Sequence, residues 1–576
     1  MKATETRPWL KYADPELIKR EMPRKSVLDY FLWRNEGRMD HPALNYYDRI
    51  FTLQEVYDNS CKAANAYAAL GVKKGDFVIV IAPTTPEIVY TFYGLSLLGA
   101  VPNMIDPRYS VDGIREFITE VDAKFVLSVD VMYDKVVEAV KGTHVEKVVV
   151  LSPAESLPKL LHFGYLLKNP MKKNMPEGFI YWGDFIEQGK DHKVEYLHGH
   201  NESCCIIVHT GGTTGRAKSV MLSHDNINAV SFQYHKSLMH TIHGVSDKFL
   251  DIMPPFVAYG FGYGIHLPIC SDQISVLIPQ FDPKNFGKLI LKHRPQNIAG
   301  TPSYFLTLIN DKRMKHADLS CFKNACAGGD GISVENEKRV SDWLIAHGSK
   351  HALTKGYGMT ELAAVSTACF LDVNRPGSVG IPHADFLIAA FDQETGEELD
   401  MGQQGEICIT GPTVMMGYYN QPEETAHILR KHADGLTWVH TGDLGYLDED
   451  GFVYILGRLK RMFPDTTGFK IFPSVIEEGI TKCPDVGECT VVGVEAVGRV
   501  QGHTPYAFFT AVPGCTKSDE ELIAEVKKTC EQNVVSYMWP EYYARLDAMP
   551  LTPIGKVDFK ELERVADAAV KSGARL

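Results

Sequence analysis

The sequence predicts an α/β fold, because apolar strand-like runs alternate with helical patterns through the first part of the chain. Residues 76–82 (Asp-Phe-Val-Ile-Val-Ile-Ala) follow a helical pattern that ends at Gly71, and apolar strand-like runs recur at 125–128 and 148–151. Strands that alternate with helices are typical of largely parallel sheets. We therefore expect α/β architecture there.

The pattern changes after Phe386, where short strands alternate with hairpin turns at residues 392–396 and 448–451. This predicts a small barrel-like sheet. The chain has 576 residues, which is too many for one core, so we expect at least two domains. The boundary should lie close to Lys460, where the charged segment 458–468 leaves a strand and meets proline and glycine. Beyond it the pattern is a compact set of short strands and helix.

Composition is that of a large globular protein. Hydrophobic residues make up 45% and charged residues 23%, and the net charge of −13 argues against a general nucleic-acid binder. Residues 1–8 are polar and lack a signal-peptide core, and apolar stretches such as 88–102 are too short to span a bilayer. The 12 cysteines contain no C-x-x-C pair. We interpret them as reduced thiols in a cytoplasmic protein.

A loop rich in glycine and threonine, residues 209–219, follows the strand-like run 204–208. Its glycines let backbone N–H groups point toward an anion, its threonines add hydroxyl donors, and Lys218 adds a positive charge. This combination suits a polyphosphate, whereas a plain surface loop would explain only the glycines. The other phosphate-binding candidates in the loop are Thr210, Gly211, Gly212, Thr213, Thr214 and Gly215.

A P-loop NTPase is the rival interpretation of this segment. A Walker loop needs a glycine, four residues, and then Gly-Lys-Ser/Thr. Counting from Gly212 places Ala217 where the second glycine belongs, followed by Lys218 and Ser219. The match therefore fails by one residue, and the order of the remaining motifs weighs against it.

Residues 356–361 (Gly-Tyr-Gly-Met-Thr-Glu) form a second candidate nucleotide motif. Tyr357 lies between two glycines, so its ring has a free face on which adenine can stack. Glu361 is a hard oxygen ligand of the kind that holds Mg²⁺ together with phosphate oxygens, and Thr360 can hydrogen-bond a phosphate. The alternative is a helix start in which Thr360 or Glu361 acts as a cap.

Two further charged residues suit a ribose or a phosphate. Asp443 follows Thr441-Gly442 and can accept hydrogen bonds from both ribose hydroxyls, although an Asx-type turn is the alternative. Arg458 ends an apolar strand after Gly457, which favours a ribose or phosphate contact over a surface position.

Taken together, the motifs resemble the AMP-forming adenylating superfamily of acyl-CoA synthetases, luciferases and peptide-synthetase adenylation domains. Residues 209–219, 356–361, 438–460 and 550–556 (Pro-Leu-Thr-Pro-Ile-Gly-Lys) match that family's motifs in its order. The resemblance runs from about Phe51 to about Leu562 and is greatest to fatty acyl-CoA synthetases.

The resemblance reverses the interpretation of Lys556, which without context would be a solvated turn residue. It implies that this lysine bridges the carboxylate substrate and the nucleotide while acyl-adenylate forms; loss of such stabilisation commonly costs about 10²–10³ in rate. The implied catalytic residues are Lys556, Glu361, Lys218 and Thr360. Gly329 and Asp330 would complete the nucleotide site, and Glu361 with Thr213 would hold Mg²⁺.

The resemblance also implies the domain plan. Residues 1–459 would form a large N-terminal domain of two α/β subdomains plus a small β-barrel-like subdomain, and residues 460–576 a small mobile α+β C-terminal domain. Lys460 would be the hinge. The C-terminal domain would present Lys556 for adenylation and then turn for thiol attack, with Gly468 on the path of CoA.

The chain departs from the family pattern near the acyl and thiol sites. Val257 follows Pro254-Pro-Phe where the family often has a histidine after Pro-Leu-Phe, and residues 475–477 read Val-Ile-Glu in place of Glu-Ile-Glu. The loop near the hinge is one residue longer and contains Pro464. Phe256, Val257 and Tyr259 are the acyl-pocket candidates, with Phe261 and Tyr263 nearby. An aromatic core is the alternative.

Residues 157–173 mix leucines and aromatics with lysines, and longer-chain fatty acyl-CoA synthetases carry a similar insertion here. A basic amphipathic segment can lie on a membrane surface. The alternative is a helix packed on the protein with its lysines in solvent.

We interpret the chain as an ATP-dependent carboxylic acid–CoA ligase that forms acyl-AMP and then acyl-CoA, on medium- or long-chain fatty acids. Its partners would be ATP, the acid, CoA and a peripheral membrane contact, with Mg²⁺ as cofactor and no nucleic acid. The alternatives are an aryl or bulky-acid CoA ligase, an adenylation enzyme that loads a carrier protein, a P-loop NTPase, and a nucleotide-binding regulator without turnover. The sequence leaves the oligomeric state open.

Overall fold

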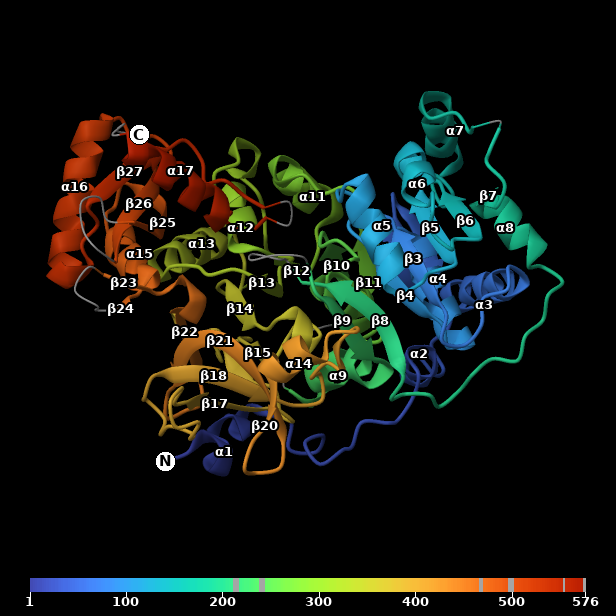
Figure 1. Cartoon of the computed structure of the whole chain (residues 1–576), viewed down its shortest axis with the longest axis horizontal. Helices are drawn as coiled ribbons and strands as arrows, with labels where there is room; N and C mark the ends of the chain where they lie inside the picture. Colours follow the sequence, from blue (N-terminus) through green and yellow to red (C-terminus); the bar gives the residue numbers. More distant parts are fainter. Residues whose placement is uncertain are drawn as a thin grey trace.

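Two large sheets with helices between and around them form most of the molecule in the computed structural model (Figure 1). The structure describes residues 1–172, 174–210, 217–237, 244–465, 470–495, 502–552 and 555–572.

The first sheet has eight strands in the order β19-β9-β8-β4-β3-β5-β6-β7. All its neighbouring pairs are parallel except β8–β9 and β9–β19. The runs predicted at 76–82, 125–128 and 148–151 are confirmed as strands β3, β5 and β6. The strands are β3 (Phe77–Ile81), β4 (Val101–Met104), β5 (Phe125–Val129), β6 (Lys147–Leu151), β7 (Phe179–Tyr181), β8 (Cys204–His209), β9 (Ser219–Ser223) and β19 (Gly417–Tyr418).

The helices of this first half are amphipathic except one. Helix α4 is buried along its whole length, because its sequence is apolar on every side and it packs against α3. Helix α7 (Lys159–Lys168) buries no residue, and each of the remaining helices buries one face. The other helices of this half are α2 (Val27–Arg34), α3 (Leu53–Ala69), α4 (Pro86–Leu98), α5 (Val111–Glu120), α6 (Tyr133–Ala139) and α8 (Trp182–Gln188).

The second sheet has nine strands in the order β16-β15-β14-β13-β12-β10-β11-β1-β2, and its central strands are parallel. Their carboxyl ends therefore share one edge, where ligands of α/β proteins bind. The strands are β1 (Pro42–Tyr46), β2 (Arg49–Thr52), β10 (Lys248–Asp251), β11 (Ile274–Leu277), β12 (Asn297–Gly300), β13 (Asn324–Gly328), β14 (Thr354–Tyr357), β15 (Thr367–Ala368) and β16 (Ile381–Pro382). Its helices are α9 (His224–Lys236), α11 (Phe286–His293), α12 (Pro302–Ile309) and α13 (Val334–Ala346).

A smaller antiparallel sheet of five strands follows, as the hairpin pattern predicts. Its strands are β17 (Leu387–Phe391), β18 (Gly405–Thr410), β20 (Leu429–Lys431), β21 (Thr437–Leu447) and β22 (Val453–Arg458). Helix α14 (Pro422–Ile428) packs on β19, β20 and β21.

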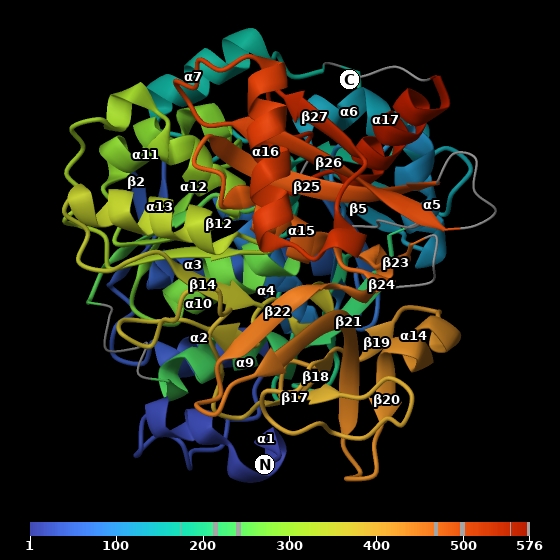
Figure 2. The same cartoon turned by 90° about the vertical axis from the view of Figure 1, so that its left-hand side faces the viewer.

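The last part of the chain forms a three-stranded sheet with helices, above the small antiparallel sheet in Figure 2. Two apolar clusters fill this part, one on each side of the sheet. Its elements are α15 (Pro473–Thr481), β25 (Val486–Glu495), β26 (His503–Ala511), α16 (Asp519–Asn533), β27 (Tyr542–Leu546) and α17 (Phe559–Ser572). The predicted boundary at residues 459 and 460 falls just after β22 and stays a prediction.

The cysteines and the helices agree with the expected reduced thiols and the expected lack of a bilayer-spanning segment among the described residues. All 12 cysteines are free thiols. Among the described residues, no helix has both the length and the apolar character needed to cross a bilayer.

A buried ion pair ties helix α13 to strand β14, next to the Tyr357 motif. Lys355 pairs with Glu337, and their side chains are only 5% and 6% exposed. Glu337 also accepts a hydrogen bond from the backbone N–H of Gly377 at 2.9 Å, and the Lys355 ammonium donates to the carbonyl of Arg375 at 3.2 Å. Each charge is therefore compensated from two directions.

We predict that Lys355→Met destabilises the protein by about 3–5 kcal/mol, because it leaves the Glu337 carboxylate buried without its cation. Chemical denaturation followed by circular dichroism measures the change. Lys338→Met is the matched control, since the Lys338–Asp342 pair on the same helix is exposed and should cost less than about 1 kcal/mol. Equal losses in the two variants would contradict the assignment of the buried pair.

Candidate active site

Three of the predicted nucleotide residues meet at one edge of the small antiparallel sheet. Tyr357 ends β14, and its hydroxyl donates a hydrogen bond to Asp443 on β21. Arg458 is the register partner of Asp443 on β22, and its Nε lies 2.9 Å from Oδ1 of Asp443. The Asp443 side chain is 2% exposed, and this burial raises its pKa although Arg458 and Tyr357 act in the opposite direction. Each carboxylate oxygen keeps a further lone pair for a ligand hydroxyl.

A bulge in β21 sets the direction of Asp443. His440 pairs with Cys408 and Leu444 with Glu406, so the segment 441–443 stands opposite a single residue of β18. The irregularity is held by hydrogen bonds: the Thr441 hydroxyl donates to the carbonyl of Ile407 at 2.6 Å, and the Asp443 N–H donates back to that hydroxyl at 3.0 Å. Bulges commonly re-aim a side chain beside an active site. The Thr441-Gly442-Asp443 motif therefore lies in the bulged segment of strand β21.

Lys556 reaches the same place from the far end of the chain. Its neighbour Val557 donates a backbone hydrogen bond to Asp330 at 3.2 Å, and the Ser303 hydroxyl donates to the carbonyl of Gly555 at 2.9 Å. A Cβ on Gly329 would lie 3.9 Å from Cε of Lys556. Burial lowers the pKa of the Lys556 amine, with Arg458 adding to that effect, while Asp330, Glu361 and Asp443 oppose it. The structure thus gathers these charged side chains around one ammonium group.

Glu361 and Lys218 are joined by Tyr418, a residue that the motifs do not contain. Glu361 lies in the 3₁₀ turn Thr360–Leu362, and its Oε1 accepts a hydrogen bond from the Tyr418 hydroxyl at 2.7 Å. The Lys218 ammonium sits 4.8 Å from the centroid of the Tyr418 ring and pairs with Glu424. Cation–π contact and ion pair together place a positive charge near the Glu361 carboxylate.

The glycine-rich loop connects two antiparallel strands, β8 and β9. Thr210 donates its N–H to the carbonyl of Lys218 at 3.1 Å, and its hydroxyl accepts from the N–H of Lys218 at 3.1 Å, so the loop is closed at its base. A P-loop instead leads from a strand into a helix. Strand β9 stands where that helix would begin, which contradicts the P-loop alternative. Gly211, Gly212, Thr213, Thr214 and Gly215 lie outside the described residues.

The acyl-pocket candidates lie where β10 leads into the helical turns of Tyr259–His266, which have π-helical hydrogen bonding. Phe256 is buried, and Val257 and Tyr259 are half-buried. The ring of Tyr259 stacks on that of Tyr263 with centroids 5.2 Å apart. The Phe261 ring instead packs against the Phe92 ring in the main core, with ring centroids 3.8 Å apart. Phe261 is therefore a core residue, as the alternative interpretation of these aromatics expects.

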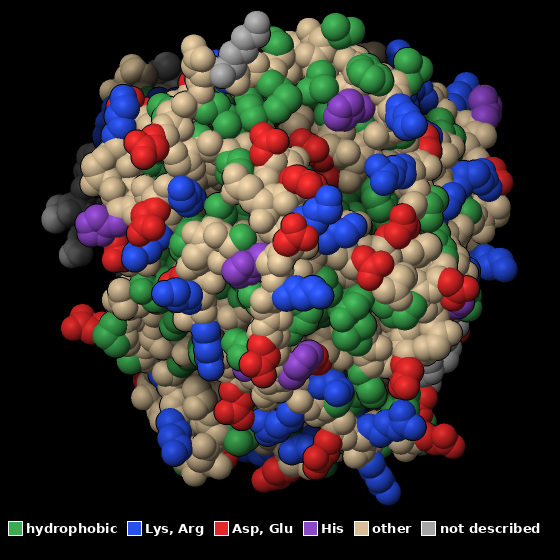
Figure 3. Space-filling view, turned by 90° about the vertical axis from the view of Figure 1, so that its right-hand side faces the viewer, with side chains coloured by type: hydrophobic (Ala, Val, Ile, Leu, Met, Phe, Trp, Pro, Cys, Tyr) green, Lys and Arg blue, Asp and Glu red, His purple; other side chains and the backbone are tan. Residues whose placement is uncertain are grey.

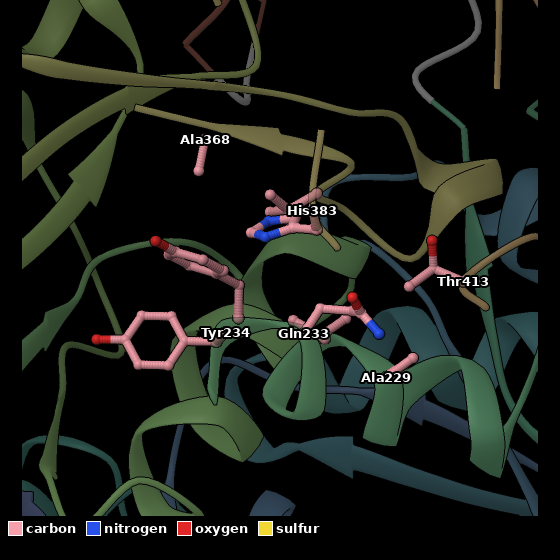
Figure 4. A pocket seen from close by; sticks show the side chains of 9 residues that line it. Ala229, Gln233, Tyr234, Ala368, His383 and Thr413 are labelled. Carbon is pink, nitrogen blue, oxygen red and sulfur yellow. The ribbon is translucent and has the colours of Figure 1, made fainter. Parts of the chain in front are cut away.

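A narrow pocket lies between α9 and the edge strands of the nine-stranded sheet, and the side chains leave about 10 Å³ free inside it, which is about the room that one water molecule needs. Figure 4 shows His383 on one side of this space, facing Tyr234 and Gln233 of α9. Burial lowers the pKa of His383 to about 4, so its imidazole is neutral near pH 7. The lining residues are Ala229, Val230, Gln233, Tyr234, Tyr263, Val365, Ala368, His383 and Thr413. Tyr263, stacked on Tyr259, connects the pocket to the acyl candidates.

The remaining predicted residues lie at the edge of the site or outside it. Lys460 is exposed in the 3₁₀ turn Leu459–Arg461, directly after β22. Gly468 lies outside the described residues. Ser303 and Tyr418 have long-range contacts to the Lys556 loop and to Glu361, and the sequence holds no local signal that would have identified them.

The C-terminal part of the chain brings Lys556 to residues of the large part, and this fold is that of an adenylate-forming enzyme. The family model for AMP-binding enzymes matches residues 31–419, and the model for the AMP-binding enzyme C-terminal domain matches residues 475–556. The chain belongs to the AMP-binding enzyme family. It is an AMP-forming acid–CoA ligase.

Individual proteins agree with this assignment. The chain is 30% identical to the long-chain-fatty-acid–CoA ligase of Bacillus subtilis (strain 168), over 96% of this chain and 96% of that protein. It is 26% identical to 4-coumarate–CoA ligase 1 of Solanum tuberosum, over 91% and 90%. Its structure resembles ATP-bound MatB from Rhodopseudomonas palustris with a TM-score of 0.79 and 23% identity, over 94% and 99%.

The turn that carries Glu361 depends on the absence of a side chain at Gly358. A Cβ there would lie 1.9 Å from the carbonyl oxygen of Ala364, and Ala363 and Ala364 already have positive φ values of 49° and 104°. The turn has no room to adjust.

We predict that Gly358→Ala lowers the rate of ATP–pyrophosphate exchange by about 10²-fold, because it displaces the residues on either side of it. Gly331→Ala is the control, since a Cβ at Gly331 would meet nothing within 4 Å. Exchange at the wild-type rate in the Gly358 variant would show that the tight turn is dispensable.

Proposed function

We propose that this ligase activates a medium- or long-chain fatty acid with the residues gathered around Lys556. The observation that carries the proposal is the convergence of Lys556, Glu361 and the Asp443–Arg458 pair on one space, from three separate parts of the chain. This space lies at the shared carboxyl edge of the parallel strands of the second sheet.

In the first half-reaction, a carboxylate oxygen of the acid attacks the α-phosphorus of ATP and pyrophosphate leaves. Negative charge builds on the phosphoryl oxygens, and the Lys556 ammonium offsets it where the acid and the nucleotide meet. Asp443 accepts hydrogen bonds from the ribose hydroxyls, and adenine stacks on Tyr357. Lys218, Thr210 and Thr360 hold phosphate oxygens, together with Gly211, Gly212, Thr213, Thr214 and Gly215.

The donor set around Glu361 fits Mg²⁺. This ion takes one or two carboxylates and completes its shell with substrate phosphates and water. Tyr418 donates to one oxygen of Glu361, which orients the carboxylate and leaves its other oxygen for a metal. Glu361 and Thr213 would hold the ion, which when bound would neutralise phosphate charge.

In the second half-reaction, the thiol sulfur of CoA attacks the acyl carbonyl, AMP leaves, and the thiol proton is lost. Lys556 has no part in this step, so the C-terminal domain can turn away. We propose residues 1–459 and 460–576 as the two domains, Lys460 as the hinge and Gly468 on the CoA path. Lys460 is exposed in the first turn after β22, where rotation disturbs little packing.

The choice of a fatty acid rests on two observations. The relative with 30% identity is a long-chain-fatty-acid–CoA ligase, and the pocket beside α9 is lined mainly by apolar and aromatic side chains. Fatty acids partition into bilayers, so we also propose a peripheral membrane contact. The 4-coumarate–CoA ligases among the relatives support an aromatic acid as the alternative, since Tyr259, Tyr263 and Tyr234 offer ring faces.

Release of AMP and pyrophosphate with Mg-ATP and CoA, across straight-chain acids of increasing length and several aromatic acids, tests the proposed substrate. AMP formation should rise with chain length into the medium or long range.

We predict that Ala229→Phe, which fills the pocket, lowers kcat/KM for the longest acids about tenfold or more and spares the shortest. Preference for an aromatic acid would contradict the proposed substrate, and ADP formation would contradict the mechanism.

We predict that Lys556→Ala lowers pyrophosphate release by about 10²–10³-fold and leaves thioester formation from supplied acyl-AMP largely intact. Lys560→Ala is the matched control, because Lys560 is an exposed lysine four residues further on. Single-turnover assays separate the two steps. Equal loss of both steps would overturn the assignment of Lys556 to adenylation.

A further inference from the structure

Helix α7 directs its apolar side chains into solvent. Leu160, Phe163 and Leu167 are 84%, 65% and 85% exposed. They recur at helical spacing and so share one face, which we call the α7 face. Single exposed leucines are ordinary, but three large apolar side chains in a row on one helix mark an interaction site. Val131 and Met171 beside them are also exposed, at 67% and 52%.

The orientation of α7 is set by polar contacts on its inner side. The Tyr165 hydroxyl donates to Oδ1 of Asp130 at 2.9 Å, and Nδ1 of His162 lies 2.8 Å from the carbonyl oxygen of Ala154. These two polar side chains therefore hold the helix to the protein, while Leu160, Phe163 and Leu167 face outward. This is the reverse of the pattern expected for a helix that packs on its own core.

Cations border the α7 face. Lys159 and Lys168, at the two ends of the helix, are exposed. Lys172 follows and lies 3.3 Å from Asp134. Figure 3 views the molecule from the side of α7, and hydrophobic side chains gather toward the top of that view. The net charge of the chain is −13, so a positive border around an apolar row is a local feature.

We propose that the α7 face docks on an anionic lipid bilayer, with Leu160, Phe163 and Leu167 in the acyl boundary and Lys159 and Lys168 at the headgroups. The inference rests on the proposed function, because an enzyme that activates fatty acids takes a substrate that concentrates in bilayers.

The shape and charge of the helix favour a bilayer over a protein groove. Figure 1 shows α7 projecting at the upper right edge of the molecule, beyond α6. A projecting helix of 10 residues is too short to cross a membrane and suits an interface, where its apolar face enters and its lysines meet phosphate headgroups. The lysines at both ends match the charge of anionic lipid.

Flotation of the full-length protein with phosphatidylcholine vesicles, with and without phosphatidylglycerol, tests the inference. We expect binding to the anionic vesicles. The triple variant Leu160→Ser, Phe163→Ser and Leu167→Ser should bind at least about a hundredfold more weakly, because each apolar side chain loses its burial in lipid. Lys159→Gln and Lys168→Gln should each weaken binding about fivefold.

Two measurements separate lipid contact from other effects. Ile345→Ser is the matched control, since Ile345 is 49% exposed on α13, far from α7 in Figure 1; it should float like the wild type. In Phe163→Trp, brominated lipid should quench the added tryptophan. Flotation is measured without substrates, so its result does not depend on the acid that is activated, and ligase activity on a short water-soluble acid should be equal in the triple variant and the wild type.

Several results would overturn the inference. They are wild-type protein that fails to float, a triple variant that floats like the wild type, and fluorescence of the tryptophan added by Phe163→Trp that brominated lipid does not quench. Self-association of the wild type that the triple variant loses would make the α7 face a contact between two copies of the chain.

Discussion

The arrangement of the site depends on the contacts that the buried Asp443 carboxylate makes with Arg458 and Tyr357. A carboxylate that is 2% exposed is tolerated only where charge and hydrogen bonds compensate it. Tyr357 supplies one donor from the nine-stranded sheet, and Arg458 supplies the cation from the adjacent strand β22. This acid therefore fixes the small sheet against the large one, and Arg458 is the last residue before the chain turns toward the C-terminal sheet.

The sequence predicts the parts of this site that are local. The hairpin pattern after Phe386 indicates the small sheet that carries Asp443 and Arg458, and the apolar run before Gly457 indicates the strand that Arg458 ends; Tyr357 is identified by the two glycines beside it. What it does not reveal is the long-range pairing: the Ser303 hydroxyl meets the carbonyl of Gly555 across 252 residues. Such contacts depend on how the sheets pack, and no local pattern encodes them. The bulge that turns Asp443 inward depends likewise on its pairing with β18.

The aromatic and glycine residues of 259–264 show the same limit. Their alternation suggests one aromatic face, but the π-helical turns divide it, with Tyr263 on the pocket and Phe261 in the core against Phe92. The interleaved glycines have separate reasons: a Cβ at Gly260 would lie 1.8 Å from the carbonyl oxygen of Pro254, and one at Gly264 would lie 2.4 Å from Oδ1 of Asp251. Asp251 ends β10 and Pro254 follows it, so both glycines leave room for groups at or just beyond the end of this strand.

The active site and the α7 face are two places where the described part of this chain departs from the ordinary rule of burial. A carboxylate lies inside at Asp443, and large apolar side chains lie outside at Leu160 and Leu167. Both departures cost folding free energy, and the surrounding structure maintains both: Tyr357 and Arg458 hold the acid in, and Tyr165 holds the helix with its apolar face out. Arrangements that oppose stability and are nonetheless held in place are expected at functional sites. The compensated burial of Asp443 supports its proposed role in ligand binding, and the exposed α7 face supports the proposed contact with a surface outside the protein.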